Sequence, residues 1–461
     1  MALLTLWVVV LGGWSVSGWS LWALLVCLPG LVGATLAASP DGHLHRRGLL
    51  ASAATLAGLL ALAPPAIGVA SLVDPGPGAW WFRALSLGPL AVVVLTAVPG
   101  RRASGATTLL AAAAVWATVI APLTPVPAAS ALAGVELLLV ILVIDRLVGE
   151  LGVGPTLIAV AVGLAGFASA SLVTAALGAD PARLAGFEEE TRLGIARLTA
   201  LSTEPIQLAE AVAPLVLLGV AAVVGLLPGR AMGVVLLGVG LVATGATQSR
   251  AALAAVLAAG LWMLLRAMGR TVLAALVVAG AVAVAAIGLS GAAIGPLDEL
   301  AGLRQGGASG ADLRVTEIWP AAIDRALERP VRGWGLAGTE EAMQRSMDEG
   351  DLRPIVFRNT HNRALELVVS LGLVGTALVV AAVAAAIADL ARRPRPLIEA
   401  LIVYVGLVGL TGPGSGSLFT GIDELLLIVA VVAATTSAQA GAGLSSAPDQ
   451  TAARRRLPAR G

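Results

Sequence analysis

The sequence predicts an all-α polytopic integral membrane protein with about 12 to 14 transmembrane helices and a long outward-facing loop subdomain. Two features lead to this fold class. Of the 461 residues, 58% are hydrophobic and only 12% are charged, whereas about a quarter of the residues in soluble proteins are charged. Apolar stretches of about 17–25 residues, the length that crosses the hydrocarbon layer as a helix, recur along the chain. They are continuous, so they do not fit the alternating segments of a β-barrel.

Each apolar run is expected to form one helix. In chain order the runs span residues 2–17, 18–38, 48–70, 84–99, 106–124, 128–146, 153–178, 208–227, 231–247, 250–268, 270–290, 363–390, 397–412 and 421–438. Gly12, Gly13 and Gly18 interrupt the first pair, so residues 1–38 form either a single span or a hairpin.

The arginines predict the orientation of the helices. They fall in alternate short loops, at Arg46, Arg47, Arg101, Arg102, Arg146, Arg230, Arg266, Arg270, Arg392, Arg393 and Arg395, and return in the tail at Arg454, Arg455 and Arg456. Such alternation is the positive-inside pattern, so we expect these loops and both termini in the cytoplasm. The intervening loops then face outward.

Two of the outward segments, 179–207 and 291–362, are too long to be simple connections. In the second, Ile318, Ala322 and Ala326 share one helical face, which predicts a partly folded outer subdomain. We therefore divide the chain into N-terminal transmembrane helices (1–178), a transmembrane catalytic region that includes the outer loop (179–438), and a disordered cytoplasmic tail (439–461).

Composition also excludes several kinds of partner. The net charge is +1 and no basic stripe is interleaved with aromatic residues, so no nucleic-acid partner is expected. Cys27 is the only cysteine, which leaves no disulfide and no thiolate metal cluster. We see no acidic or histidine cluster on the outer side that would hold a metal, and no cofactor is expected. His43 and His45 fall in a predicted cytoplasmic loop and are expected to be solvated.

His361 is the leading candidate for chemistry. It lies in the polar segment Arg358–Arg363, between Asn359 and Asn362, where the chain enters the apolar run that follows. A titratable imidazole at the outer end of a membrane helix can act as a general base, although a histidine at a helix start is also found without such a task.

Two arginines are the candidate anion-binding groups on the same side of the membrane. Arg250 follows Ser249 between two apolar runs, and Arg314 begins the helical stretch of the outer loop. Arg250 is either a snorkelling side chain or the floor of an outward cavity. Arg314 is either a surface partner of Glu317 or an anion ligand.

The order and spacing of these residues resemble the bacterial O-antigen ligase and polymerase superfamily. The pair His361-Asn362, followed after nine residues by Gly372 and after two more by Gly375, resembles the superfamily's His-Asn-x9-Gly-x-x-Gly signature. Further likeness lies in Ser249–Ala252, in Arg314 with Trp319, in Pro330–Gly335, and in Arg197–Thr199 with Pro205, although Ile206 stands where the superfamily often has Asn.

The resemblance implies a metal-independent membrane glycosyltransferase at the outer face of the bacterial inner membrane, acting in cell-surface polysaccharide assembly. It would transfer a glycan from undecaprenyl diphosphate to the hydroxyl of an acceptor glycolipid, glycan or protein, without a cofactor. The implied catalytic residues are His361, Arg314 and Arg250. The implied substrate-binding residues are Arg197, Arg332, Arg358, Asn359 and Asn362.

The alternative function is a transporter or flippase for a polyprenyl-linked or other amphiphilic substrate. Such a protein is expected to carry charges deep in several spans and to show pseudo-symmetric halves, whereas the charges here gather in the outer loops. A structural scaffold would leave the order of the motifs unexplained. The sequence does not choose among lipid, glycan and protein acceptors.

Overall fold

The computed structural model describes residues 41–73, 103–176, 205–289, 314–349, 360–411 and 422–436, and single positions or pairs at 36, 191–192, 195–196 and 198. The helices are α3 (Gly42–Val73), α5 (Gly105–Ile120), α6 (Pro127–Leu151), α7 (Val153–Ala176), α9 (Pro205–Val212), α10 (Pro214–Val223), α11 (Arg230–Thr247), α12 (Arg250–Ala267), α13 (Thr271–Leu289), α16 (Trp319–Glu328), α17 (Thr339–Asp348), α18 (Arg363–Arg392), α19 (Pro396–Thr411) and α20 (Ile422–Thr435). A 3-10 turn, η1 (Ala121–Leu123), a π-helical turn, η2 (Arg314–Ile318), and two antiparallel two-residue strands, β1 (Thr191–Arg192) and β2 (Ile195–Ala196), complete the described elements.

The predicted fold class is confirmed. Within the described part of the chain, seven helices are long and apolar enough to cross a membrane, and three shorter apolar helices accompany them. Eleven of the fourteen predicted apolar runs coincide with described helices. The other three, 2–17, 18–38 and 84–99, lie outside the described residues, so the total number of spans stays a prediction. The protein is an all-α, multi-pass membrane protein.

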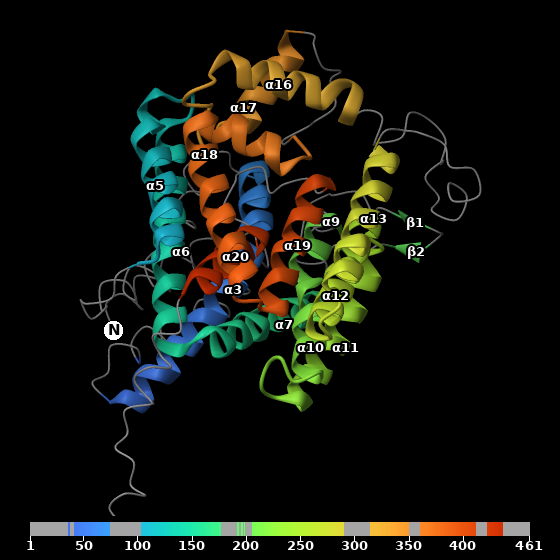
Figure 1. Cartoon of the computed structure of the whole chain (residues 1–461). Helices are drawn as coiled ribbons and strands as arrows, with labels where there is room; N and C mark the ends of the chain where they lie inside the picture. The colour runs from blue at the N-terminus through green and yellow to red at the C-terminus, as the bar shows by residue number, and fades with distance from the viewer. Residues whose placement is uncertain are drawn as a thin grey trace, which may run out of the picture.

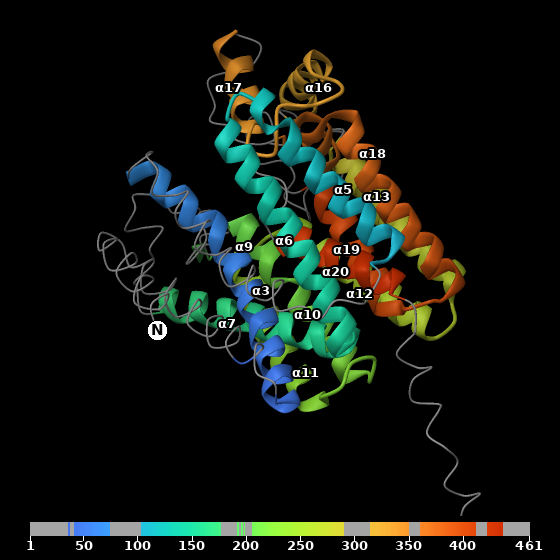
Figure 2. The same ribbon diagram turned by 90° about the vertical axis from the view of Figure 1, so that its left-hand side faces the viewer.

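The molecule is a helical bundle with a small helical cap at one end. Helices α16 and α17 lie across the end of the bundle at which α18 begins (Figures 1 and 2). The turn between α10 and α11, which leads into Arg230, lies at the opposite end (Figure 1). Helix α18 runs away from the cap for 30 residues, so its arginine-rich end and the cap lie on opposite sides of the bundle.

Small side chains allow the bundle helices to approach closely. The most extensive contacts pair α10 with α11, α3 with α7, α12 with α19, and α5 with both α6 and α18. On α10, a Cβ atom added to Gly219 would lie 2.6 Å from the backbone nitrogen of Leu237 on α11, so only glycine fits there. Lipid tails are as apolar as leucine, and association between helices in a membrane therefore depends on such close packing.

An ion pair links helices α12 and α19. Near the end of α12, Nε and Nη2 of Arg266 donate to the two oxygens of Glu399 on α19 at 2.5 and 2.9 Å. The indole nitrogen of Trp262 donates to the same carboxylate at 3.1 Å. These hydrogen bonds satisfy a carboxylate that is itself buried, so they favour one pairing of the faces of α12 and α19.

Candidate active site

The site is built around the start of α18. The side chain of Asn362 caps this helix, because its Oδ1 accepts hydrogen bonds from the backbone nitrogens of Ala364 and Leu365 at 3.0 and 3.3 Å. His361 immediately precedes the cap and has a φ of +51°, in the left-handed region. For a residue with a side chain such a conformation costs about 1–3 kcal/mol, and it is found most often at functional sites.

Thr360 and Glu366 hold the backbone on both sides of His361. Both residues are buried, and Glu366 Oε2 accepts hydrogen bonds from the backbone nitrogen of Thr360 at 3.1 Å and from its hydroxyl at 2.9 Å. The same hydroxyl oxygen lies 2.7 Å from the carbonyl oxygen of Asn362. Glu366 is thus a buried carboxylate that holds the backbone where α18 begins.

His361 lies within the electrostatic reach of Arg314, the first residue of η2. Burial, and then the charge of the Arg314 guanidinium, lower the pKa of His361 from 6.5 to about 4. At neutral pH the imidazole is therefore uncharged, and one of its ring nitrogens is able to accept a proton. The structure brings together two of the three residues predicted to be catalytic.

The loop that follows α16 packs against a break in α18. Gly372 interrupts the helix with a φ of +63°, and a Cβ atom there would lie 2.3 Å from the carbonyl oxygen of Val331. The loop takes over the hydrogen bonds that the break leaves open. The backbone nitrogens of Trp334 and Gly335 donate to the carbonyl oxygens of Val369 and Ser370 at 2.7 and 2.8 Å, and that of Leu373 donates to Pro330 at 2.7 Å.

Helix α5 closes the other side of the break. The indole nitrogen of Trp116 donates to the carbonyl oxygen of Leu371 at 3.1 Å. A Cβ atom on Gly375 would lie 3.0 Å from the ring of Trp116, so the second glycine of the signature admits this contact. Two motifs therefore form one backbone junction, namely the glycine motif that follows His361 and the Pro330–Gly335 motif. In this junction the carbonyl oxygens of Val369, Ser370 and Leu371 accept hydrogen bonds from outside α18.

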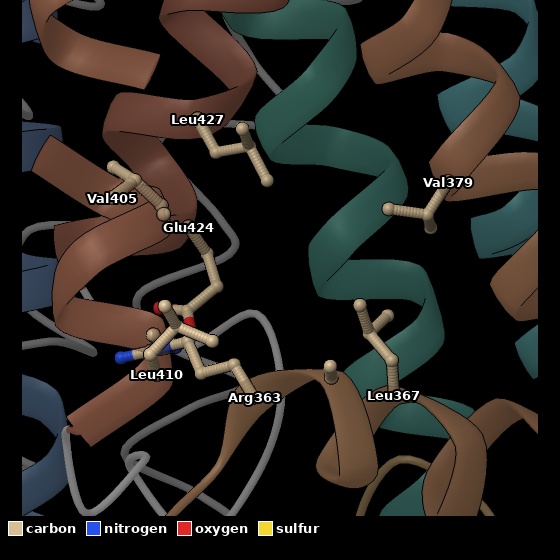
Figure 3. Close-up of a pocket in the computed structure, with 10 residues that line it drawn as sticks. Arg363, Leu367, Val379, Val405, Leu410, Glu424 and Leu427 are labelled. Carbon is tan, nitrogen blue, oxygen red and sulfur yellow. The ribbon is translucent and has the colours of Figure 1, made fainter. Parts of the chain in front are cut away.

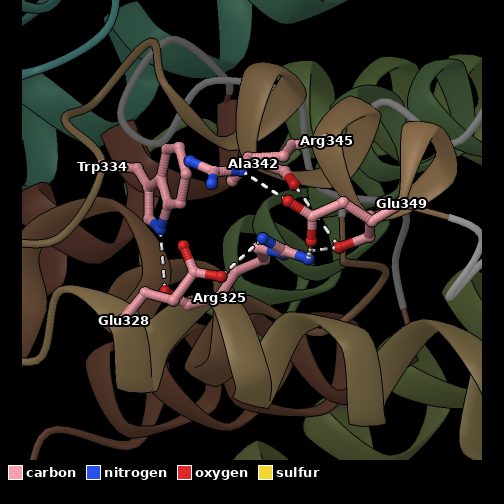
Figure 4. Close-up of polar contacts among 7 residues, drawn as sticks. Arg325, Glu328, Trp334, Ala342, Arg345 and Glu349 are labelled. Atoms are coloured by element: carbon pink, nitrogen blue, oxygen red, sulfur yellow. Dashed lines mark hydrogen bonds and ion pairs between the residues drawn. The ribbon is translucent and has the colours of Figure 1, made fainter.

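The cap that presents this loop is internally cross-linked (Figure 4). Arg325 on α16 is buried and donates to Ser346 on α17 at 2.8 Å, to Glu328 at 2.5 Å, and also to Glu349. The indole nitrogen of Trp334 donates to the carbonyl oxygen of Arg325 at 2.8 Å, so the loop is tied to the same network. Charge-assisted bonds of this kind are stronger than neutral ones, and the cap is thus a defined platform.

The apolar side of the cap follows the sequence prediction. The predicted face of Ile318, Ala322 and Ala326 is buried, in a cluster that includes Trp334 and Val369 of α18. The cluster is separate from the main core of the bundle. Residues 314–349 are therefore folded, and their position on the outer side of the membrane stays a prediction.

Two arginines of the loop that joins α16 and α17, Arg329 and Arg332, lie near Arg345 of α17. The guanidinium of Arg329 stacks over the ring of Trp334 at 4.1 Å, and that of Arg345 lies 5.9 Å from the same ring. Burial, followed by the charges of Arg332 and Arg345, lowers the pKa of Arg329. Arg332, one of the predicted substrate-binding residues, therefore belongs to a region of positive charge next to the α18 break.

Arg250 occupies a separate junction, at the first residue of α12. It is exposed, and a tight turn precedes it in which Gln248 has a φ of +54° and Ser249 is buried. Within the described residues, Gln248 and His361 are the non-glycine positions with positive φ. Gln248 lies two residues before Arg250, and His361 is itself a predicted catalytic residue. Helix α12 packs mainly against α19 and α13 rather than against α18.

The segment that carries Arg197 reaches this same junction. The backbone nitrogen of its neighbour Leu198 donates to the carbonyl oxygen of Ala246, near the end of α11, at 2.9 Å. Arg197 itself lies outside the described residues, as do Arg358 and Asn359. Their predicted roles in substrate binding stay predictions.

Arg363, the first residue of α18, has a structural environment. It forms an ion pair with Glu424 on α20, and its Nη2 lies 3.7 Å from Glu210 on α9. Arg363 and Glu424 stand at one end of a cavity of about 200 Å³ between α18, α19 and α20, whose walls are otherwise apolar (Figure 3). Two carboxylates therefore lie close enough to balance the charge of Arg363.

Sequence reasoning did not find the Thr360–Glu366 contact, the contribution of Trp116, or the joining of the two glycine motifs. The signal for the last of these was the glycine residue at positions 333 and 372, since both glycines have positive φ and face each other's backbone. The contribution of Trp116 has no local signal, because its partner lies 255 residues further along the chain.

Comparison with known proteins assigns the region just described. Residues 232–380 match the family model described as O-antigen ligase, a stretch that runs from α11 into α18 and contains Arg250, Arg314 and His361. No curated protein and no solved structure matches the chain. Residues 232–380 therefore form a region similar to the O-antigen ligase family, in a chain that is a multi-pass membrane protein.

Proposed function

We propose that this protein is a metal-independent glycosyltransferase that moves a glycan from undecaprenyl diphosphate to an acceptor hydroxyl at the outer face of the inner membrane. The observation that carries the proposal is the neutral imidazole of His361 beside Arg314, inside a region that matches the O-antigen ligase family. A neutral base next to a fixed cation suits a reaction in which a hydroxyl loses a proton and a diphosphate leaves.

In the proposed reaction, His361 accepts the proton of the acceptor hydroxyl as the oxygen of that hydroxyl attacks the anomeric carbon of the glycan. The bond between that carbon and the diphosphate oxygen breaks, and the electron pair stays with the leaving diphosphate. The products are a new glycosidic bond, undecaprenyl diphosphate, and a protonated His361. The proton returns to solvent or to the diphosphate before the next turnover.

Arginine is well suited to stabilise this leaving group. Its guanidinium keeps its charge and binds phosphate oxygens through two parallel hydrogen bonds. Negative charge builds up on the diphosphate as the glycosidic bond breaks, so Arg314 and Arg250 would bind the transition state more tightly than the ground state. The exposed position of Arg250 at the start of α12 is compatible with contact to a substrate that enters from the membrane surface.

The donor itself would bring His361 to its working pKa. In the free protein Arg314 contributes to a pKa of about 4, which makes the imidazole a weak base at neutral pH. A bound diphosphate places negative charge near Arg314 and offsets its effect. The pKa of His361 would then rise towards the operating pH, where general base catalysis is most efficient.

The remaining predicted contacts would position the substrate. The Oδ1 of Asn362 is engaged in capping α18, so its amide NH₂ is the group left to donate to a sugar hydroxyl. Arg332, Arg197, Arg358 and Asn359 are proposed to contact the diphosphate or the glycan. The cap lies opposite the arginine-rich turns, which supports an outward-facing site under the positive-inside rule.

The test is transfer by the purified protein in liposomes, with a labelled undecaprenyl-diphosphate glycan and a panel of lipid, glycan and protein acceptors. We expect a new glycosidic bond, and a loss of about 10²- to 10³-fold in rate for Arg314→Ala and for Arg250→Ala. Arg392→Ala is the matched control, because Arg392 is an exposed arginine at the far end of α18. Translocation of the donor without a new bond would instead favour a flippase.

A further inference from the structure

The buried contact between Glu366 and Thr360 is not used in the proposed reaction, yet it surrounds the proposed base. Glu366 comes from the first turn of α18, and it binds both donors of Thr360, the backbone nitrogen at 3.1 Å and the hydroxyl at 2.9 Å. Thr360 is fully buried and Glu366 is 2% exposed. A carboxylate that receives two hydrogen bonds from a single residue fixes both the backbone and the side chain of that residue.

The hydroxyl of Thr360 also constrains the backbone on the other side of His361. The backbone nitrogen of Asn362 donates to that hydroxyl at 3.3 Å, which closes a turn of the type that serine and threonine form two residues ahead. His361 is the central residue of the turn and has a φ of +51°. Asn362 is fixed in turn by its capping bonds at the start of α18. The backbone is therefore held on both sides of His361.

We propose that Thr360 and Glu366 are positioning residues that together form a latch, which holds the imidazole of His361 beside Arg314 in a conformation that the histidine would not adopt by itself. The inference rests on the proposed function, and it adds to that function the means by which the base is oriented. The latch touches no substrate. It acts only through the backbone of His361.

The proposed latch requires a particular chemical group from Thr360 and another from Glu366. Thr360 must supply a hydroxyl, which serine retains and the similarly shaped valine lacks. Glu366 must supply an oxygen acceptor, which the amide oxygen of glutamine retains and leucine lacks. A residue that merely fills space would show the opposite order, with valine and leucine better tolerated than serine and glutamine.

The experiment compares Thr360→Val with Thr360→Ser, and Glu366→Leu with Glu366→Gln, in the full-length protein in liposomes. We expect Thr360→Val to lower kcat by about 10²-fold with little change in the KM of the donor, because a misplaced base loses the contribution of proton transfer. Thr360→Ser should restore most of this loss. Thr156→Val is the matched control, since Thr156 is equally buried on α7 and its hydroxyl donates to the carbonyl oxygen of Gly152, just before that helix and away from His361.

A second measurement does not depend on activity. Diethylpyrocarbonate modifies accessible neutral imidazoles, and mass spectrometry of the peptide that contains His361 gives its rate, with His43 and His45 as internal references. We expect Thr360→Val and Glu366→Leu to label several-fold faster at His361 than the wild type, and Thr360→Ser and Thr156→Val to label at the wild-type rate. Release of the latch opens the turn and exposes the ring.

The two readouts separate the latch from the proposed function. Wild-type labelling of His361 in Thr360→Val would overturn the latch, whatever the activity of the protein. Faster labelling with an unchanged kcat would also overturn the proposal, because the position of His361 would then not matter for the reaction. The proposed function fails on a different result, which is full transfer activity in a variant that lacks His361.

Discussion

Replacement of Gly372 by alanine tests whether the break in α18 depends on glycine. The new Cβ would lie 2.3 Å from the carbonyl oxygen of Val331, and the left-handed φ of +63° would disfavour alanine by about 1–2 kcal/mol. The contact forces the Pro330–Gly335 loop to move, which endangers the three backbone hydrogen bonds that it makes to α18. At about 0.5–1.5 kcal/mol each, these bonds bring the expected destabilisation of the loop to about 2.5–6.5 kcal/mol.

Hydrogen exchange measures this effect directly, because the amides of Trp334 and Gly335 are protected only while the loop is packed on α18. A destabilisation of about 3 kcal/mol corresponds to exchange about 10²-fold faster in the peptide that covers residues 330–336. Gly238→Ala on α11 is the control, since a Cβ at Gly238 meets nothing within 4 Å. If Gly372→Ala showed wild-type protection, our account of the junction would be wrong.

Three further predictions concern the chemistry of the site. The neutral form of His361 is the active one, so kcat/KM should be constant above its pKa of about 4 and fall tenfold per pH unit below that value. A pH–rate profile measures this dependence, and a fall in kcat/KM that begins near pH 6.5 would contradict it. Arg314→Gln should raise the pKa of His361 but leave it below 6.5, because burial is the larger cause of the shift. The nitrogen chemical shifts of the imidazole report this pKa, and an unchanged value would refute the electrostatic pairing of His361 with Arg314. Exhaustive treatment with a chelator should leave the transfer rate unchanged, and a loss that Mg²⁺ or Mn²⁺ restores would rule out a metal-independent reaction.

The helices were predictable because the bilayer imposes a length and a composition on each span. All eleven predicted apolar runs that coincide with described residues are helical, and the amphipathic face of Ile318 was also visible in the sequence. The finer divisions were less predictable. The run 208–227 is two helices, α9 and α10, because Pro214 begins a new helix where its ring would otherwise clash with the preceding turn.

The site was predictable only in part, because order along the chain does not give distances. The sequence order pointed to His361 and Arg314, and the structure brings them together. It did not show that Gly333 and Gly372 face each other, since that contact joins a loop to a helix interior. Nor did it show the positive φ of His361, which arises from the hydrogen bonds of its neighbours rather than from its own residue type.

The central claim is that His361 is the base for glycan transfer, and one comparison tests it most directly. His361→Ala and His43→Ala are assayed side by side in liposomes with a labelled undecaprenyl-diphosphate glycan, after equal insertion has been verified. His43 is exposed on α3 and serves as the matched histidine. We predict that His361→Ala loses at least about 10²-fold in rate while His43→Ala keeps wild-type activity. Wild-type transfer by His361→Ala would contradict the account.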